Sequence, residues 1–181
     1  MEDVLLKVKN LTVHYVTRSE TVKAVNNVSF ELRKGETIGL VGETGAGKTT
    51  IARTIMHILP APPAQIVSGT VELEGEDLYK KSETELEKIR GNKMAMVFQD
   101  PMTALNPALT VGDQVLESLE IHNLDKRSKE ELDARVDELF KLVGIPPERK
   151  KEYPHQFSGG MKQRVVIAMA LSCNPKLLIA D

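Results

Sequence analysis

The chain has 181 residues, of which 41% are apolar and 28% are charged, and its formal net charge at pH 7 is −2. This length suffices for one ordinary domain, and the composition fits a soluble globular protein with a buried core. The small net charge gives no basic surplus for binding nucleic acid. The only cysteine, Cys173, excludes a disulfide framework and a cysteine-based zinc site.

No targeting or membrane-spanning segment is visible in the sequence. Met1–Asn10 alternates charged and apolar residues, unlike a signal peptide. The longest apolar run, Val165–Cys173, is about half the length needed to cross a bilayer. We therefore expect a cytosolic chain that reaches a membrane only where a partner holds it there.

The first third of the chain is predicted to be mostly β-structure. Leu5–Val13 alternates apolar and polar residues, and Ser29–Leu32 resembles it, so both are predicted strands. Thr37–Val41 is a short apolar run ending at a glycine, which predicts a buried strand. A helix is expected over Lys48–Leu59, with its apolar residues on one face. These residues are Ile51, Ile55, Ile58 and Leu59.

The rest of the chain is predicted to be rich in helices. The expected elements are a loop at Ala61–Ala64, an edge strand at Thr70–Leu73, a helix opened by a capping box at Ser82–Glu85 and ending near Gly91, a strand at Met94–Phe98, a loop at Gln99–Pro107, helices at Val111–His122, Lys129–Val143 and Val165–Ser172, and a buried strand at Leu177–Ala180. Three apolar strands separated by helical stretches predict a parallel α/β sheet.

A glycine-rich segment between the third strand and the first helix matches the P-loop pattern, G-x-x-x-x-G-K-[ST]. Its residues are Gly42, Glu43, Thr44, Gly45, Ala46, Gly47, Lys48 and Thr49, followed by Thr50. Glycines let successive N–H groups point at phosphate oxygens, and the helix N-terminus favours an anion. Lys48 is expected to reach the β- and γ-phosphates of ATP, and Thr49 to bind Mg²⁺. The glycine spacing disfavours a dinucleotide-binding fold.

Asp181 supplies the second half of this predicted site. It follows the apolar run Leu177–Ala180, so its carboxylate is expected at the C-terminal end of a buried strand. This is the Walker B arrangement, in which an acidic side chain helps to hold Mg²⁺. The four histidines show no metal-ligand spacing.

A second candidate anion site begins at Ser158. Ser158, Gly159 and Gly160 precede a predicted helix, so the serine hydroxyl and exposed N–H groups are expected to form its N-terminal cap. The stretch Phe157–Arg164 resembles the LSGGQ signature of ABC ATPases, with Phe157 in place of leucine and Met161 in place of glutamine. Val97–Pro107, Tyr153–Met161 and Leu177–Asp181 are similar to the oligopeptide, dipeptide and nickel importers of that family. The resemblance covers nearly the whole chain.

The resemblance implies a P-loop NTPase, RecA-like α/β core with an N-terminal antiparallel β portion and a helical subdomain. The expected parts are residues 1–99, with β-structure and the P-loop, residues 100–173, with helices and the signature, and the Walker B strand at 174–181. Gln99 would sense Mg²⁺ and the γ-phosphate. Tyr15 would stack on adenine, or would be an ordinary tyrosine at the end of a strand. Ser158, Gly159 and Gly160 would contact ATP on the other subunit of a head-to-tail dimer.

The implied function is ATP-driven import of oligopeptides or dipeptides, with nickel as the alternative. The subunit would sit at the cytoplasmic face of the cell membrane through permease subunits, and its ATPase partner would be a paralogue or a second copy. Three other readings remain open. These are a soluble ABC ATPase of DNA repair or translation, a non-catalytic regulatory subunit, and a P-loop kinase or GTPase.

The sequence departs from the family pattern after Asp181. A catalytic glutamate, a D-loop, a switch histidine and a further core strand would follow there, and none is in the sequence. We therefore expect a fold that is incomplete at the C-terminus, either as a fragment of a longer protein or as a natural truncated product. For this chain alone, we expect weak nucleotide binding and no efficient hydrolysis.

Overall fold

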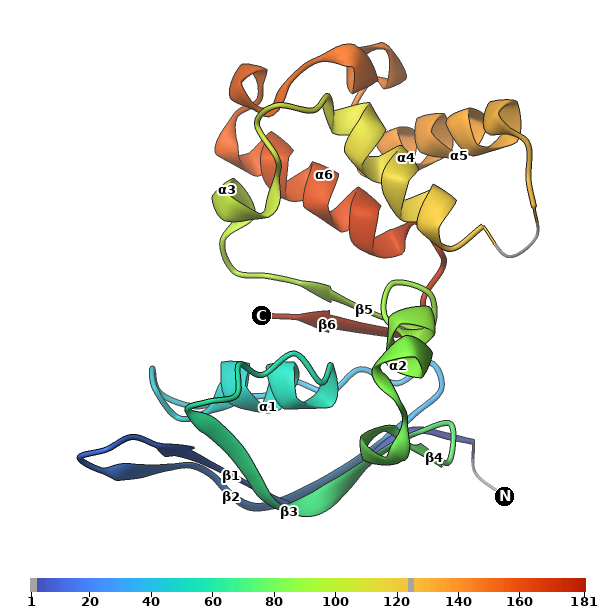
Figure 1. The fold of residues 1–181 in the computed structure, drawn as a ribbon. Coiled ribbons are helices and arrows are strands. Elements are labelled where there is room, and N and C mark those ends of the chain that lie inside the picture. The colour runs from blue at the N-terminus through green and yellow to red at the C-terminus, as the bar shows by residue number, and fades with distance from the viewer. Residues whose placement is uncertain (1–2, 124–125) are drawn as a thin grey trace. The chain divides into compact units, whose positions relative to one another are not determined.

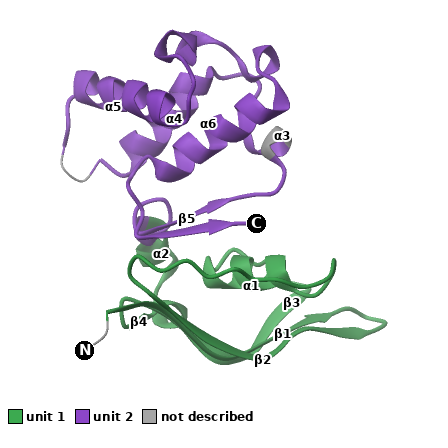
Figure 2. Cartoon of the chain, turned by 180° about the vertical axis from the view of Figure 1, so that it is seen from behind, with its two compact units in different colours: residues 1–87, 181 green, residues 88–180 purple. Residues whose placement is uncertain are grey.

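A computed structural model describes residues 3–123 and 126–181 of the chain. It divides into two compact units, coloured separately in Figure 2: residues 1–87 together with Asp181, and residues 88–180. Each unit has its own buried apolar side chains. The domain boundaries expected from the sequence stay a prediction.

The first unit is built on an antiparallel sheet (Figure 1). Its strands run in the order β2-β1-β3-β4 and span Val4–Val16 (β1), Thr21–Arg33 (β2), Ala64–Leu73 (β3) and Glu76–Asp77 (β4). Val8 of β1 pairs with Phe30 of β2 on one side and with Val71 of β3 on the other. Leu6 and Val8, two residues apart in β1, are both buried, as the strand period requires for residues on one face of a sheet.

Strand β3 differs from the edge strand that was predicted at Thr70–Leu73. It begins at Ala64 instead of Thr70, and it lies between β1 and β4, so it is not an edge strand. Gly69 interrupts the apolar pattern because β1 and β3 approach closely there. An added Cβ would lie 2.6 Å from the Cα of Leu11, and the φ angle of Gly69 is +106°. The glycine that obscured the strand in the sequence is therefore required by the pairing.

The first helix, α1, spans Lys48–Ile55 and ends before the predicted Leu59. His57 has a left-handed φ of 53°. Its N–H donates to the carbonyl of Thr54 (3.1 Å), and the N–H of Ile58 donates to the carbonyl of Arg53 (3.0 Å). This pair of hydrogen bonds is the Schellman ending of a helix, which usually carries glycine at the left-handed position. Ile58 and Leu59 consequently lie outside α1.

Thr37–Val41 is not a strand, so this prediction was wrong. The segment belongs to neither sheet, and Ile38, Leu40 and Val41 are 43%, 45% and 94% exposed. A strand exists only through hydrogen bonds to a neighbour, and an apolar run cannot supply that neighbour.

The second unit contains a parallel pair of strands and a helical layer (Figure 1). Strand β5 (Met94–Val97) pairs with β6 (Leu177–Ala180), so two of the three predicted parallel strands are present. β6 was predicted to be buried, but Leu178 is 44% exposed. The helices are α3 (Pro101–Ala104), α4 (Val111–Ile121), α5 (Lys129–Leu142) and α6 (Gly159–Leu171), with short 3₁₀ turns η2 (Pro147–Lys151) and η3 (Pro154–Gln156). They share one apolar core that includes Val115, Leu139, Phe140 and Val165.

One local prediction needs correction. The expected loop Gln99–Pro107 contains the short helix α3. Helix α2 spans Glu83–Ile89, and Ser82 and Glu85 make contact at its start as predicted. The carboxylate of Glu85 accepts hydrogen bonds from the N–H (2.8 Å) and the hydroxyl (2.6 Å) of Ser82. The first unit also contains the 3₁₀ turn η1 (Leu78–Lys80). Across the described ranges, no helix has the length and apolar character needed to span a membrane.

Candidate nucleotide-binding site

The glycine-rich loop is an exposed segment that leads directly into α1. Gly45 and Gly47 have φ angles of 83° and 89°, which side chains rarely adopt. A Cβ on Gly47 would also lie 2.3 Å from the carbonyl oxygen of Ala24 in β2. The loop therefore needs glycine at position 47 both for its backbone conformation and for its contact with the sheet.

The N-terminus of α1 carries no side-chain cap. Gly47 is the N-cap residue, and it has no side-chain oxygen to accept a hydrogen bond from the first-turn N–H groups. These donors, together with the helix dipole, give the loop a positive electrostatic character. Because the preceding loop is exposed, an anion can approach these donors from solvent.

The side chain of Lys48 makes hydrogen bonds to the loop that precedes it. Its Nζ donates to the carbonyl oxygens of Gly42 and Glu43, each at 2.7 Å. The positive charge of Lys48 is therefore held beside the exposed amides of the loop. Its two present acceptors, the carbonyl oxygens, carry no net charge. A phosphate group would offer this ammonium a stronger, charged acceptor in the same region.

Two hydroxyl groups at the start of α1 connect the loop to distant parts of the sequence. The Oγ1 of Thr49 donates to the Oδ1 of Asp181 at 2.8 Å. The Oγ1 of Thr50 shares a hydrogen bond of 3.2 Å with the hydroxyl of Tyr15, at the end of β1. The first unit thus brings together Tyr15, the loop and Asp181.

The pair formed by Thr49 and Asp181 suits a magnesium ion. A hydroxyl and a carboxylate are hard oxygen donors, and Mg²⁺ in phosphate-binding sites takes one or two such protein ligands along with water and phosphate oxygens. These two oxygen donors therefore fit a magnesium ion that arrives with a phosphate ligand. Within the described ranges, no group of three or more histidine, cysteine, aspartate or glutamate side chains is placed to hold a metal ion.

The segment Ser158–Gly160 opens α6 in the second unit. Ser158 is extended, with φ −66° and ψ 162°, and its Oγ accepts a hydrogen bond from the N–H of Met161 at 3.4 Å. Gly159 and Gly160 are exposed, and a Cβ on either would meet nothing within 4 Å. The predicted serine cap is present, and the surface over the two glycines is open.

Gln99 also belongs to the second unit, where it is exposed and follows β5 after Phe98. The structure therefore brings Tyr15, Lys48, Thr49, Thr50 and Asp181 together, while Gln99 and Ser158–Gly160 are described only within their own unit.

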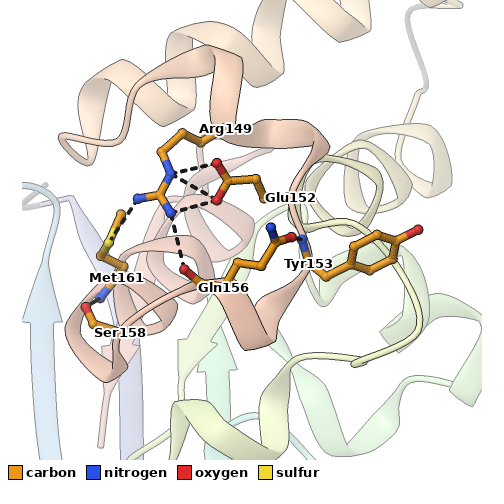
Figure 3. A network of polar contacts seen from close by, with 6 residues as sticks. All are labelled: Arg149, Glu152, Tyr153, Gln156, Ser158 and Met161. Atoms are coloured by element: carbon orange, nitrogen blue, oxygen red, sulfur yellow. Dashed lines mark hydrogen bonds and ion pairs between the residues drawn. The ribbon is translucent and has the colours of Figure 1, made fainter.

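Two residues that the sequence did not single out also shape these segments. Ala24 packs under Gly47, and Arg149 contacts both flanks of Ser158–Gly160 (Figure 3). Neither lies in a recognisable motif. The one local signal was the spacing of Arg149 and Glu152, which suits a pair across a helical turn.

Comparison with known proteins agrees with this geometry. The family model described as "ABC transporter" matches residues 25–181. The chain is 50% identical over 179 residues to the oligopeptide transport ATP-binding protein OppD of Bacillus subtilis, covering 98% of the chain and 49% of that protein. It is 52% identical over 179 residues to the dipeptide transport ATP-binding protein DppD of the same organism, covering 98% of the chain and 53% of that protein.

Solved structures show the same fold. A dimeric structure of the ATP-binding cassette MJ0796, in a post-hydrolysis state bound to ADP and Pi, matches with a TM-score of 0.87 and 32% identity. That match covers 98% of this chain and 73% of the solved one. The fold is thus a P-loop NTPase core with an N-terminal antiparallel sheet and a helical subdomain. The chain spans about half the length of the B. subtilis relatives, 49% and 53%. The chain belongs to the ABC transporter family.

Proposed function

We propose that this chain is the ATP-binding part of an ABC importer that takes up oligopeptides or dipeptides. One observation carries the ATP-binding half of this proposal. An exposed glycine-rich loop holds Lys48 beside uncapped helix amides, with Thr49 and Asp181 in hydrogen-bond contact at its end. The names of the relatives, which are oligopeptide and dipeptide transport proteins, support the choice of substrate.

Each residue predicted to contact the chain's own nucleotide has a distinct role in this proposal. The loop amides at positions 42–47 and the ammonium of Lys48 bind the β- and γ-phosphates of ATP. The hydroxyl of Thr49 and the carboxylate of Asp181 hold Mg²⁺, which supplies positive charge against the phosphate oxygens. Tyr15 stacks on the adenine ring, and its hydrogen bond to Thr50 fixes it near the loop. Gln99 senses Mg²⁺ and the γ-phosphate.

The second unit contributes to a site on another subunit. Ser158, Gly159 and Gly160 contact the γ-phosphate of ATP bound by the partner, either a paralogue or a second copy, in a head-to-tail dimer. The open surroundings of both glycines support this role, because no described residue comes within 4 Å of a Cβ added to either of them. Permease subunits hold the dimer at the cytoplasmic face of the membrane, so the ATPase is peripheral.

Uptake measurements with a Lys48→Ala variant test this proposal. Loss of one charged group that stabilises a transferring phosphoryl group costs about 10²–10³-fold in rate, so uptake of a labelled dipeptide or oligopeptide should fall to background. Lys129→Ala is the matched control, because Lys129 is also the first residue of a helix and lies in the other unit. Normal uptake by Lys48→Ala, in cells with no other copy, would contradict the proposal. Uptake of Ni²⁺ in place of peptides would correct the substrate.

A further inference from the structure

Arg149 lies in the 3₁₀ turn η2 and makes a concentrated set of contacts through one guanidinium group (Figure 3). Its Nε lies 3.1 and 3.0 Å from the two carboxylate oxygens of Glu152, and its Nη2 donates to Oε2 of the same residue at 2.6 Å. These hydrogen bonds lower the pKa of Glu152, so the pair stays ionised at neutral pH. Glu152 therefore fixes the orientation of the planar guanidinium group.

The remaining surface of the same guanidinium group faces the start of α6. Nη2 also donates to the carbonyl oxygen of Gln156 at 3.3 Å, and Nη1 donates to the Sδ of Met161 at 3.3 Å. The Cζ of Arg149 lies 4.5 Å from the centroid of the Phe157 ring, a cation–π contact. Arg149 thus contacts the two residues before Ser158–Gly160 and the residue after it.

The segment Ser158–Gly160 is held by the first turn of α6 and by its flanking residues. The carbonyl oxygen of Ser158 accepts a hydrogen bond from the N–H of Lys162 at 2.9 Å, whereas the cap bond from Met161 to Ser158 is long, at 3.4 Å. A Cβ added to Gly159 or Gly160 would meet nothing within 4 Å, so no side-chain packing is seen at either glycine among the described residues. The flanking residues are well held, since Phe157 is 5% exposed and the side chain of Gln156 accepts a hydrogen bond from the N–H of Tyr153 at 2.8 Å. Contacts at the flanks therefore contribute to the direction of the exposed amides.

We propose that Arg149 is a positioning residue, which holds the exposed amides at Ser158–Gly160 in the direction that the partner's γ-phosphate requires. This inference rests on the proposed function, because it assigns those amides to ATP on a second subunit. It predicts a specific defect. Losing Arg149 should impair turnover at the site completed by Ser158–Gly160, and it should leave ATP binding at the chain's own P-loop intact.

The test measures ATP hydrolysis by the assembled transporter, together with binding of a fluorescent ATP analogue to the chain's own P-loop. Arg149→Gln should lower kcat about ten- to a hundredfold, the effect expected when groups facing a reacting centre are misplaced. The dissociation constant of the analogue should not change. Arg149→Lys should be almost as impaired, because an ammonium cannot reproduce the planar fork or its stacking on Phe157.

Arg135→Gln provides the matched control in the same unit. Arg135 also pairs with a glutamate three residues on, Glu138, and donates to a carbonyl oxygen, that of the Asn174 side chain, but it does not contact the start of α6. The two arginine side chains are similarly exposed, at 23% and 27%. Arg135→Gln should therefore hydrolyse ATP at the wild-type rate.

Three results would overturn the inference alone. They are a normal kcat for Arg149→Gln, a full rescue by Arg149→Lys, and a loss of analogue binding as large as the loss of turnover. Failure of the proposed function looks different. In that case the wild-type assembly would show no ATP hydrolysis that depends on Lys48, and the inference would fall with it.

Discussion

The glycine-rich loop before α1 and the glycine pair that opens α6 look alike in sequence and differ in structure. In the loop, Gly47 is left-handed, and a side chain there would collide with the backbone of Ala24. At the start of α6, neither Gly159 nor Gly160 has a positive φ, and neither has a neighbour within 4 Å of an added Cβ. Close packing therefore requires glycine at position 47, while no described neighbour requires glycine at position 159 or 160.

This difference separates two reasons for placing glycine at a helix N-terminus. A glycine demanded by the fold contributes to stability, and its replacement damages the unit that contains it. A glycine with open surroundings costs conformational entropy on folding, and close packing does not require it. In the proposed function, such a glycine lets the partner's phosphate approach the backbone closely.

The largest effect is expected for Gly47→Ala. A left-handed alanine costs about 1–2 kcal/mol, and the clash with Ala24 adds about 1–3 kcal/mol of overpacking. The free energy of unfolding should fall by the sum, and ATP binding should disappear. Chemical denaturation and an ATP titration measure both quantities. Gly45→Ala is the control, because it is equally left-handed and meets nothing within 4 Å. Equal stability losses for both variants would break the argument from close packing.

A smaller and opposite effect on stability is expected for Gly160→Ala. Alanine is favoured over glycine in a helix by up to about 1 kcal/mol, so the free energy of unfolding should rise. ATP turnover by the assembled dimer should nevertheless fall, because the new methyl group covers the exposed amides. Gly112→Ala, in the same unit, should destabilise instead, since its Cβ would lie 2.6 Å from the carbonyl oxygen of Lys150. A destabilised Gly160→Ala with normal turnover would reverse the comparison.

The smallest effect concerns His122, the side chain beside Gly91. Gly91 has a positive φ, as Gly47 does, but its close neighbour is a side chain and not backbone. Its φ is +80°, and an added Cβ would lie 2.5 Å from the Nε2 of His122. Burial lowers the pKa of His122 from its ordinary value. The unfolded chain therefore binds a proton at His122 more readily than the folded chain does. Protonation of the unfolded chain favours unfolding, so the free energy of unfolding should fall slightly as the pH drops through about 6.5. Unfolding of wild type and His122→Gln at pH 8 and pH 5.5 measures this, and an identical loss in both would exclude His122 as the source.

Most of the local elements could be predicted because their signals lie within a few residues. The P-loop pattern, the serine cap at Ser158 and the periodic helices α4 and α5 all depend on adjacent sequence. The short helix α3 also had a local signal, because proline at a first helical position favours a helix start. This signal was overlooked.

The wrong predictions have non-local causes. Thr37–Val41 has the composition of a strand, but a strand needs a paired neighbour that no local pattern supplies. The end of α1 depends on a left-handed His57, whose ring lies 5.5 Å from that of Tyr79. The role of Arg149 was hidden for the same reason. Its contacts with Phe157 and Met161 are visible only once η2 and α6 lie together.

The hydrogen bond between Thr49 and Asp181 joins residues that are 132 positions apart in the chain. Contacts of such high sequence separation form late, because the entropy of closing a long loop must be overcome first. The strands β1 to β4 pair over much shorter spans and can assemble while the chain is still emerging from the ribosome. The carboxylate of Asp181 reaches the loop only after the whole second unit has been synthesised, so folding of the sheet in the first unit and formation of the contact between Thr49 and Asp181 are separate events in time.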